Sequence, residues 1–320
     1  MELYGLEQVD EAVAEIQERT EESLLTRPNV VGVGVGRKTV NGFETNEPCL
    51  LVLVSRKLPE SVLDLDARIP ALVEHCKTDV VEVGSVAALN TSVDSARGKN
   101  SLTRRVRPAQ GGFSIGRVGG ITGTIAAAAI DAEPSCGVPN RYYLLSSNGT
   151  LAGLNQGQEG DPILQPGSMD GGNFPQDTLA RLARFVPIHF DGQPNQVDAA
   201  IAEVSFGDLD PGVFWVGQPS GRAPRVRIAQ TVQKTGPSTC YSTGLVKAVN
   251  VTLDVSYGAR KARFCKQILT TPLATVGDVG SLALDSVRRA VGMILAASAS
   301  VAVVSPIGLV EALLGVRVGW

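Results

Sequence analysis

Thr275-Val-Gly-Asp-Val-Gly-Ser-Leu-Ala-Leu284 is the stretch of this chain that tells most about its fold. It sets turn residues directly before a short apolar run, and this pattern extends from Gly111 to about Ser305. Many short strands separated by Gly, Pro, Asn and Asp are typical of β-barrels or of a sandwich. The runs are Ile121-Thr-Gly-Thr-Ile125, Tyr142-Tyr-Leu-Leu145, Val197 to Val204, Gly244 to Val249 and Val291 to Leu295.

The ends of the chain follow other patterns. Near the N-terminus, apolar residues at helical spacing predict an amphipathic helix. They are Leu6, Val9, Val13 and Ile16, and Pro28-Asn29 ends the helix. Three runs rich in Val and Leu predict strands, at Val30–Gly36, Cys49–Val54 and Asp79–Val83. We therefore expect a small α/β domain over residues 1–90, a polar linker over 91–110, and a β domain over 111–320. Pro306 to Leu314 predicts a closing amphipathic helix, with Ile307, Val310, Leu313 and Leu314 on its apolar face.

The glycine-rich stretch Gly32-Val-Gly-Val-Gly36 invites a nucleotide-binding interpretation, which its context disfavours. Its spacing is not G-x-G-x-x-G, and Arg37-Lys-Thr-Val-Asn-Gly42 resembles a hairpin turn instead of a helix N-terminus. We therefore predict a glycine-rich strand against which another backbone packs closely.

The composition disfavours several kinds of partner and cofactor. The net charge is -3 and aromatics make up 5%, which disfavours nucleic acid as a partner. No apolar run approaches the roughly 20 residues that a membrane helix needs. Five scattered cysteines and two histidines disfavour zinc, so we expect free thiols, a cytoplasmic protein, and neither metal nor cofactor. The cysteines are Cys49, Cys76, Cys136, Cys240 and Cys265.

The stretch from Thr275 to Leu284 resembles the segment around the nucleophile of the chymotrypsin/trypsin family. The likeness is strongest to bacterial trypsin-like peptidases with a small N-terminal α/β domain, and it covers most of the chain. Other stretches that carry it are Asn29 to Gly36, Thr78 to Gly84, Arg107 to Gly116, Gly160 to Gly167 and Val303 to Ile307. The resemblance implies a mainly β fold: two six-stranded-type antiparallel barrels after the α/β domain.

The resemblance also implies the positions of a His, Asp and Ser triad. Val197-Asp-Ala-Ala-Ile-Ala-Glu203 matches the strand that carries the acid, which places the acid at Asp198. Leu144-Leu-Ser-Ser-Asn-Gly-Thr150 matches the stretch before the histidine, so that position holds Gly149. The position of the nucleophile holds Val279. A glycine cannot accept a proton and a valine cannot attack a carbonyl, so two of the three members are missing.

Further site residues are implied by the same resemblance. The oxyanion hole would use the backbone N–H groups of Gly277 and Val279. Asp278 is interpreted as a carboxylate that caps a turn. A peptide cleft without an acid at its base would bind by strand addition. Its walls would be Leu273, Val276, Leu295, Ala296 and Ser298.

Two functions remain open. The first is a protease homologue that does not cut and acts by binding a peptide or protein partner, or as a scaffold. The second is an active hydrolase with a displaced base, His75 or His189, and a displaced nucleophile, Ser147 or Ser281. A structural subunit of an assembly is a weaker third possibility, and the oligomeric state does not follow from the sequence.

Overall fold

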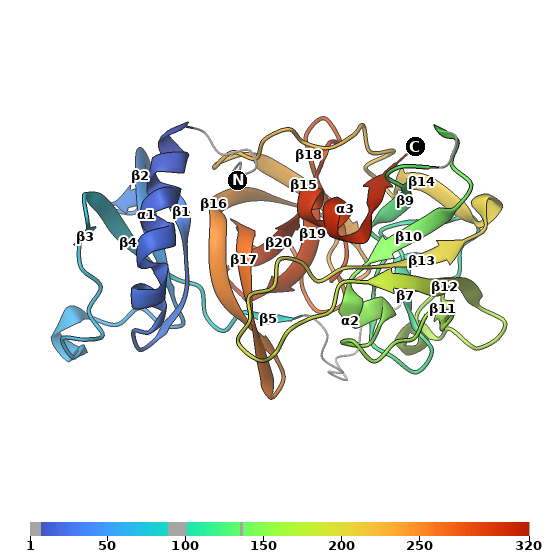
Figure 1. Cartoon of the computed structure of the whole chain (residues 1–320), viewed down its shortest axis with the longest axis horizontal. Helices are drawn as coiled ribbons and strands as arrows, with labels where there is room; N and C mark the ends of the chain where they lie inside the picture. The colour runs from blue at the N-terminus through green and yellow to red at the C-terminus, as the bar shows by residue number, and fades with distance from the viewer. Residues whose placement is uncertain (1–7, 89–100, 135–136, 320) are drawn as a thin grey trace.

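A computed structural model describes residues 8–88, 101–134 and 137–319. The fold has three parts that lie side by side: an N-terminal part and two barrels (Figure 1). The first half of the predicted linker, up to residue 100, lies outside the described residues, as do Leu6 and Cys136. β-strands dominate, and one long helix and the four strands of the N-terminal part come first. The predicted fold class, mainly β with an N-terminal helix and strands, is confirmed.

The N-terminal part is a helix laid on a small sheet, as its apolar pattern predicts. Its elements are α1 (Gln8–Leu25), β1 (Val30–Val40), β2 (Phe43–Val54), a 3-10 turn (Glu60–Val62), β3 (Leu72–Val73) and β4 (Cys76–Glu82). Val13 and Ile16 of α1 are buried in one core cluster with Val33 and Val35 of β1. The strand β1 is longer than predicted, and only Asn41 and Gly42, with φ of 53° and 83°, make the turn. Positive φ at both central residues gives a tight hairpin turn that follows the twist of the strands.

The glycines of β1 allow a second strand to approach. β1 pairs antiparallel with β16 (Cys240–Tyr257), with Gly32 opposite Leu253. A Cβ at Gly32 would lie 2.7 Å from Leu253 Cβ and 2.8 Å from the Thr252 carbonyl oxygen. This confirms the predicted close packing of another backbone. It also makes the sheet of the N-terminal part continuous with the barrel beside it, in one 11-stranded sheet.

That barrel is a closed antiparallel ring. The path β15-β18-β19-β20-β17-β16 closes because β15 also pairs with β16. Its further strands are β15 (Thr231–Gly236), β17 (Arg260–Thr270), β18 (Leu282–Asp285), β19 (Ala290–Ala297) and β20 (Ala302–Pro306). We call this ring the second barrel, since it is formed by the later part of the chain.

The first barrel is built from an eight-stranded antiparallel sheet in the order β21-β9-β10-β13-β12-β11-β7-β8. Its strands are β7 (Ser114–Arg117), β8 (Thr122–Thr124), β9 (Ala127–Asp131), β10 (Tyr142–Ser146), β11 (Pro162–Leu164), β12 (Thr178–Phe185), β13 (Ala200–Val204) and β21 (Val316–Val318). The consecutive strands β8 and β9 lie far apart in this order, since β8 pairs with β7 whereas β9 pairs with β10 and β21. Between them, Ile125 N donates to Phe113 O at 2.9 Å, and Ile125 O accepts from Gly112 N at 2.8 Å.

The chain also has short elements outside the two main sets of barrel strands. They are β5 (Ala87–Ala88), a 3-10 turn (Ser101–Thr103), β6 (Ala109–Gly111), α2 (Asn148–Leu151), 3-10 turns at Ser168–Asp170 and Phe206–Asp208, β14 (Leu209–Val213) and α3 (Ile307–Leu314). The helix α3 follows β20 of the second barrel and leads to β21 of the first, and one apolar cluster spans α3 and both barrels. Within α3, Ile307, Val310 and Leu314 are buried as expected, but Leu313 is 48% exposed. Leu102 and Ala109, in the described half of the predicted linker, are buried in the core of the first barrel.

Candidate functional site

The first two predicted triad positions lie together at one end of the first barrel. Asp198, shortly before β13, is only 1% exposed. The Gly149 amide, in the short helix α2, donates to Asp198 Oδ1 at 3.2 Å. Ser147 caps α2, because its Oγ accepts from the Thr150 amide at 3.1 Å. The Gly149 amide of the same turn is left to donate to Asp198. The position predicted for the histidine thus contacts the predicted acid through its backbone.

A tyrosine that the sequence analysis did not single out completes the surroundings of Asp198. Tyr257, the last residue of β16, donates its hydroxyl to Asp198 Oδ2 at 3.1 Å. Its ring packs edge-on to Phe190, with the ring centroids 5.5 Å apart, and stacks with Phe264. Burial raises the pKa of Asp198 to about 6, although hydrogen bonds from the Gly149 amide, the Tyr257 hydroxyl and the Asn148 amide oppose the rise. Burial and the nearby carboxylate hold the pKa of Tyr257 well above its ordinary value.

The loop that carries Val279 lies against the same region. Val279 is fully buried, and its carbonyl oxygen accepts from the Thr124 amide at 2.9 Å. Thr124 Oγ1 donates to Gly277 O at 2.8 Å. A Cβ at Gly280, which has a φ of 86°, would lie 2.4 Å from Ser146 Oγ and 3.2 Å from the Ser147 amide. The loop therefore abuts the start of α2, at the junction of the two barrels.

The predicted oxyanion-hole amides belong to this loop. Gly277 has a φ of 94°, so its backbone conformation favours glycine. Among the described residues, neither the Gly277 amide nor the Val279 amide has a hydrogen-bond acceptor.

A buried ion pair holds the loop that carries Gly277 and Val279. Asp278 caps the turn, as expected, by accepting from the Thr275 amide at 3.0 Å. Its carboxylate also accepts from the Ser238 amide at 2.9 Å and from Thr239 Oγ1 at 2.8 Å. Lys234 Nζ lies 3.0 Å from Asp278 Oδ2, and both side chains are fully buried. Burial lowers the pKa of Lys234, and the Asp278 carboxylate opposes that shift.

The edge of β19 pairs with another part of this chain. Ala88 and Ala87 of β5 lie antiparallel opposite Ala296 and Ala297. On the other side of β5, the Ser256 amide of β16 donates to Val86 O at 3.0 Å. We call the space between β19 and the end of β16 the strand cleft. Figure 1 shows β5 entering between the N-terminal part and the first barrel.

The predicted cleft residues divide between two places. Ala296 pairs with β5, Ser298 Oγ donates to Val83 O at 2.5 Å, and Leu295 is buried in one cluster with Val86. Leu273, by contrast, is buried in the core cluster that contains Val279, and Val276 packs against that cluster.

The displaced bases and nucleophiles are not brought together. His75 is exposed in the turn between β3 and β4, and His189 is exposed between β12 and β13. Neither imidazole hydrogen-bonds to any of the described residues. Ser147 caps α2, and Ser281 donates to the Asp278 carbonyl oxygen at 2.5 Å. Each of the two hydroxyls therefore has a structural partner.

Two other kinds of site are absent from the part of the chain that the structure describes. No group of three or more His, Cys, Asp or Glu side chains in residues 8–88, 101–134 and 137–319 could hold a metal ion. No helix in the same residues has the length and apolar character needed to cross a membrane. The four cysteines in this part of the chain are free thiols.

Comparison with known proteins found no matching family and no matching curated protein. Among solved structures, the chain is similar to protease A of Thermobifida fusca, with a TM-score of 0.47 and 15% identity over 66% of this chain and 98% of that one. It is also similar to a chymotrypsin of Cellulomonas bogoriensis, with a TM-score of 0.44 and 17% identity over 65% and 97%. A Nocardiopsis protease has a TM-score of 0.46 and 16% identity over 66% and 98%.

Proposed function

We propose that this chain is a homologue of trypsin-like serine proteases that does not cut peptide bonds and acts by binding a protein or peptide partner. The observation that carries the proposal is the contact between the Gly149 amide and Asp198 Oδ1. It supports the assignment of Gly149 to the position of the base. Val279, in the loop against α2, supplies no nucleophile.

The chemical consequence is large. A serine hydroxyl attacks only when a neighbouring base takes its proton, and an acid orients that base. With neither a hydroxyl at position 279 nor an imidazole at position 149, Asp198 has no imidazole to orient, and it is bonded to Tyr257 instead. Loss of the serine or the histidine alone costs on the order of 10⁶ in turnover in a related triad. Backbone amides at Gly277 and Val279 could still polarise a carbonyl oxygen, but they cannot attack one.

Binding by strand addition does not depend on the triad. The edge of β19 accepts β5 through its backbone, so it is able to bind an extended segment. In this proposal the cleft holds either the chain's own β5 or a peptide of a partner that replaces it. The second function, a hydrolase with a displaced base, would need an imidazole bonded to a nucleophile. Among the described residues, neither the His75 nor the His189 imidazole makes a hydrogen bond.

A labelling experiment tests the proposal. The purified chain is treated with a fluorophosphonate probe beside a peptidase assay on a mixed peptide library. We expect no labelled serine and no turnover above the buffer blank. A labelled serine in either barrel, or turnover that the variants His189→Ala or His75→Ala abolish, would contradict the proposal.

Restoring both groups tests the assigned positions. The double variant Gly149→His and Val279→Ser is expected to be labelled at position 279, whereas Val279→Ser alone is not, because the hydroxyl then lacks a base. Thermal unfolding of each variant serves as the control for folding. If the folded double variant stays unlabelled, the assignment of Gly149 or Val279 is wrong.

A further inference from the structure

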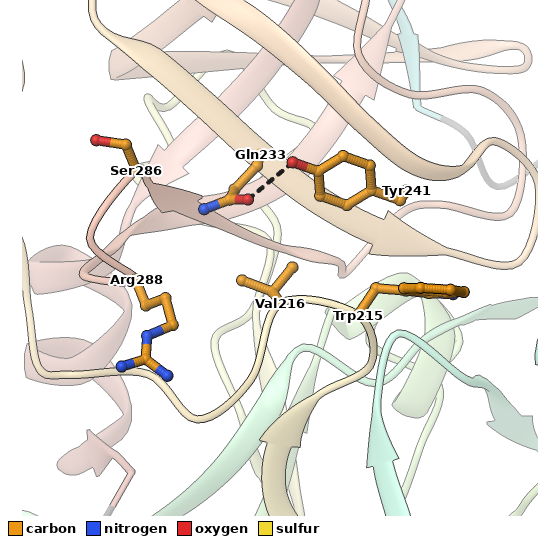
Figure 2. A pocket seen from close by; sticks show the side chains of 6 residues that line it. All are labelled: Trp215, Val216, Gln233, Tyr241, Ser286 and Arg288. Carbon is orange, nitrogen blue, oxygen red and sulfur yellow. Dashed lines mark hydrogen bonds between the residues drawn. The ribbon is translucent and has the colours of Figure 1, made fainter.

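A pocket of about 550 Å³ opens between the turn that follows β14 and the turn that joins β18 to β19 (Figure 2). Its volume lies within the range of about 300–1,000 Å³ found for ligand sites. None of its residues belongs to the triad positions or to the strand cleft. They are Trp215, Val216, Gln233, Tyr241, Ser286 and Arg288.

The aromatic end of the pocket is held in place by a tight turn. The Gly217 amide donates to Val213 O at 2.7 Å, and the Val213 amide donates to Gly217 O at 3.0 Å. Inside this turn Trp215 has a φ of 69°, which bulky residues rarely adopt, and the residue is 78% exposed. A fixed backbone thus presents a large apolar ring to solvent. Because this turn is already ordered, binding loses less conformational entropy here than it would at a flexible loop.

The opposite end carries a cation without an acidic partner. Arg288 has a φ of 66°, and its amide donates to Asp285 O at 3.0 Å. Arg289 pairs with Asp285 at 2.7 Å, and Arg222 has Glu311 at 3.6 Å. The Arg288 guanidinium has neither an ion pair nor a hydrogen bond within the part of the chain that the structure describes. Figure 2 shows Arg288 and Trp215 on opposite sides of Val216.

The wall between the two ends is also fixed. Tyr241 donates its hydroxyl to Gln233 Oε1 at 3.0 Å, and Gln233 Nε2 donates to the Asp285 carbonyl oxygen at 2.8 Å. These bonds hold the Tyr241 ring beside the pocket, and Ser286 lines the pocket from the same turn as Arg288. Trp, Tyr and Arg are the residues that most often supply binding energy in protein interfaces.

We propose that this pocket binds the carboxylate of an aromatic amino acid, as found at the C-terminal end of a peptide. The aromatic ring lies against Trp215, Val216 and Tyr241. The carboxylate binds the fork of donors on the Arg288 guanidinium, a geometry that suits two parallel hydrogen bonds. This site is independent of the strand cleft and of the lost triad.

Calorimetric titration of the whole chain with matched acids and amides tests the site. The probes are N-acetyl-phenylalanine and Gly-Gly-Gly-Gly-Phe, each as the free acid and as the C-terminal amide. We expect both acids to bind, and each amide to bind at least about tenfold more weakly, because the charged hydrogen bonds are lost. Tighter binding of the peptide acid identifies a peptide end as the source, and tighter binding of N-acetyl-phenylalanine identifies a free amino-acid derivative.

Two variants assign the roles within the pocket. Arg288→Gln is expected to remove the preference for acid over amide, and Trp215→Ala is expected to weaken all four probes by at least about tenfold. The matched control is Arg317→Gln, at an exposed position on β21, which leaves all four affinities unchanged. Equal binding of acid and amide by the unaltered chain, or no binding of either acid at millimolar concentration, would overturn the proposal.

Discussion

Tyr257 and Asp198 join the two barrels through one buried hydrogen bond. The phenol ends β16 of the second barrel, the carboxylate precedes β13 of the first, and 3.1 Å separates their oxygens. Both groups lie inside the protein, and Asp198 also accepts from the Gly149 amide. A carboxylate removed from water needs such donors, because an unpaired buried charge is costly. The pair therefore links the protonation of Asp198 to the stability of the junction.

The first prediction concerns the pH dependence of stability. The folded pKa of Asp198 is about 6, above the value of about 3.9 for an unfolded aspartate. The folded state thus holds the proton of Asp198 more tightly than the unfolded state does. The stability that this difference contributes is fully present below pH 4 and is lost as the pH rises through 6. Two pKa units correspond to about 3 kcal/mol. We expect Asp198→Asn to lose less stability between pH 4 and pH 7 than the unaltered chain does, measured by urea unfolding.

Tyr257→Phe is the companion variant. It removes a donor that favours the charged carboxylate, so it should cost about 1.5–3 kcal/mol at pH 8 and less below pH 5. Tyr142→Phe serves as its control, because the Tyr142 hydroxyl donates to an uncharged acceptor, the Pro139 carbonyl oxygen, at 3.3 Å. Parallel pH profiles for the two tyrosine variants would contradict the proposed coupling.

A second prediction concerns Lys234, whose ammonium is the counterion of Asp278 inside the protein. Lys234→Met leaves the carboxylate buried without a cation, which should cost about 3–5 kcal/mol of unfolding free energy. The double variant Lys234→Met and Asp278→Asn removes both charges and should recover part of that loss. Lys247→Met is the matched control, since the exposed pair between Lys247 and Glu44 is worth only about 0–1 kcal/mol. Equal losses for the two lysine variants would show that the buried pair contributes nothing.

Local sequence patterns were enough to predict several elements. α1 and α3 follow from apolar spacing, and β1 follows from its alternating valines, because each depends on neighbours within a few residues. Gly149 and Asp198, placed by resemblance, lie in contact in the structure. The glycines of β1 also indicated the close approach of a second strand, but not that this strand would be β16.

Other parts of the site depend on contacts between distant residues, which carry no local signal. Tyr257 lies 59 positions from Asp198, and nothing in the sequence around it distinguishes it from any strand tyrosine. Lys234 sits in an ordinary strand, where a lysine is expected to be exposed. The pairing of β5 with β19 joins residues about 200 positions apart, and two alanines are too short a run to predict a strand. Only the folded chain brings these groups together.

The last prediction tests whether the strand cleft accepts a peptide. Proline at position 87 lacks the N–H group that a strand needs, so Ala87→Pro should release β5 from β19. A fluorescently labelled peptide with the sequence of residues 83–88, Val-Gly-Ser-Val-Ala-Ala, is then titrated and followed by anisotropy. We expect binding to the variant at least about tenfold tighter than to the unaltered chain, where β5 competes at a high effective concentration.

The control for this experiment changes the peptide instead of the protein. The same peptide with an N-methyl group at each alanine keeps its side chains but loses its backbone donors, so it should not bind if strand pairing provides the affinity. Ser298→Ala offers a milder opening, because it removes the bond to Val83 O together with the bonds that Ser298 Oγ accepts from the Ser300 and Val301 amides, and leaves the backbone of β5 unaltered. It should give an affinity between those of the unaltered chain and Ala87→Pro. Binding of the methylated peptide with equal affinity would mean that side-chain pockets, and not the β19 edge, hold the segment in the cleft.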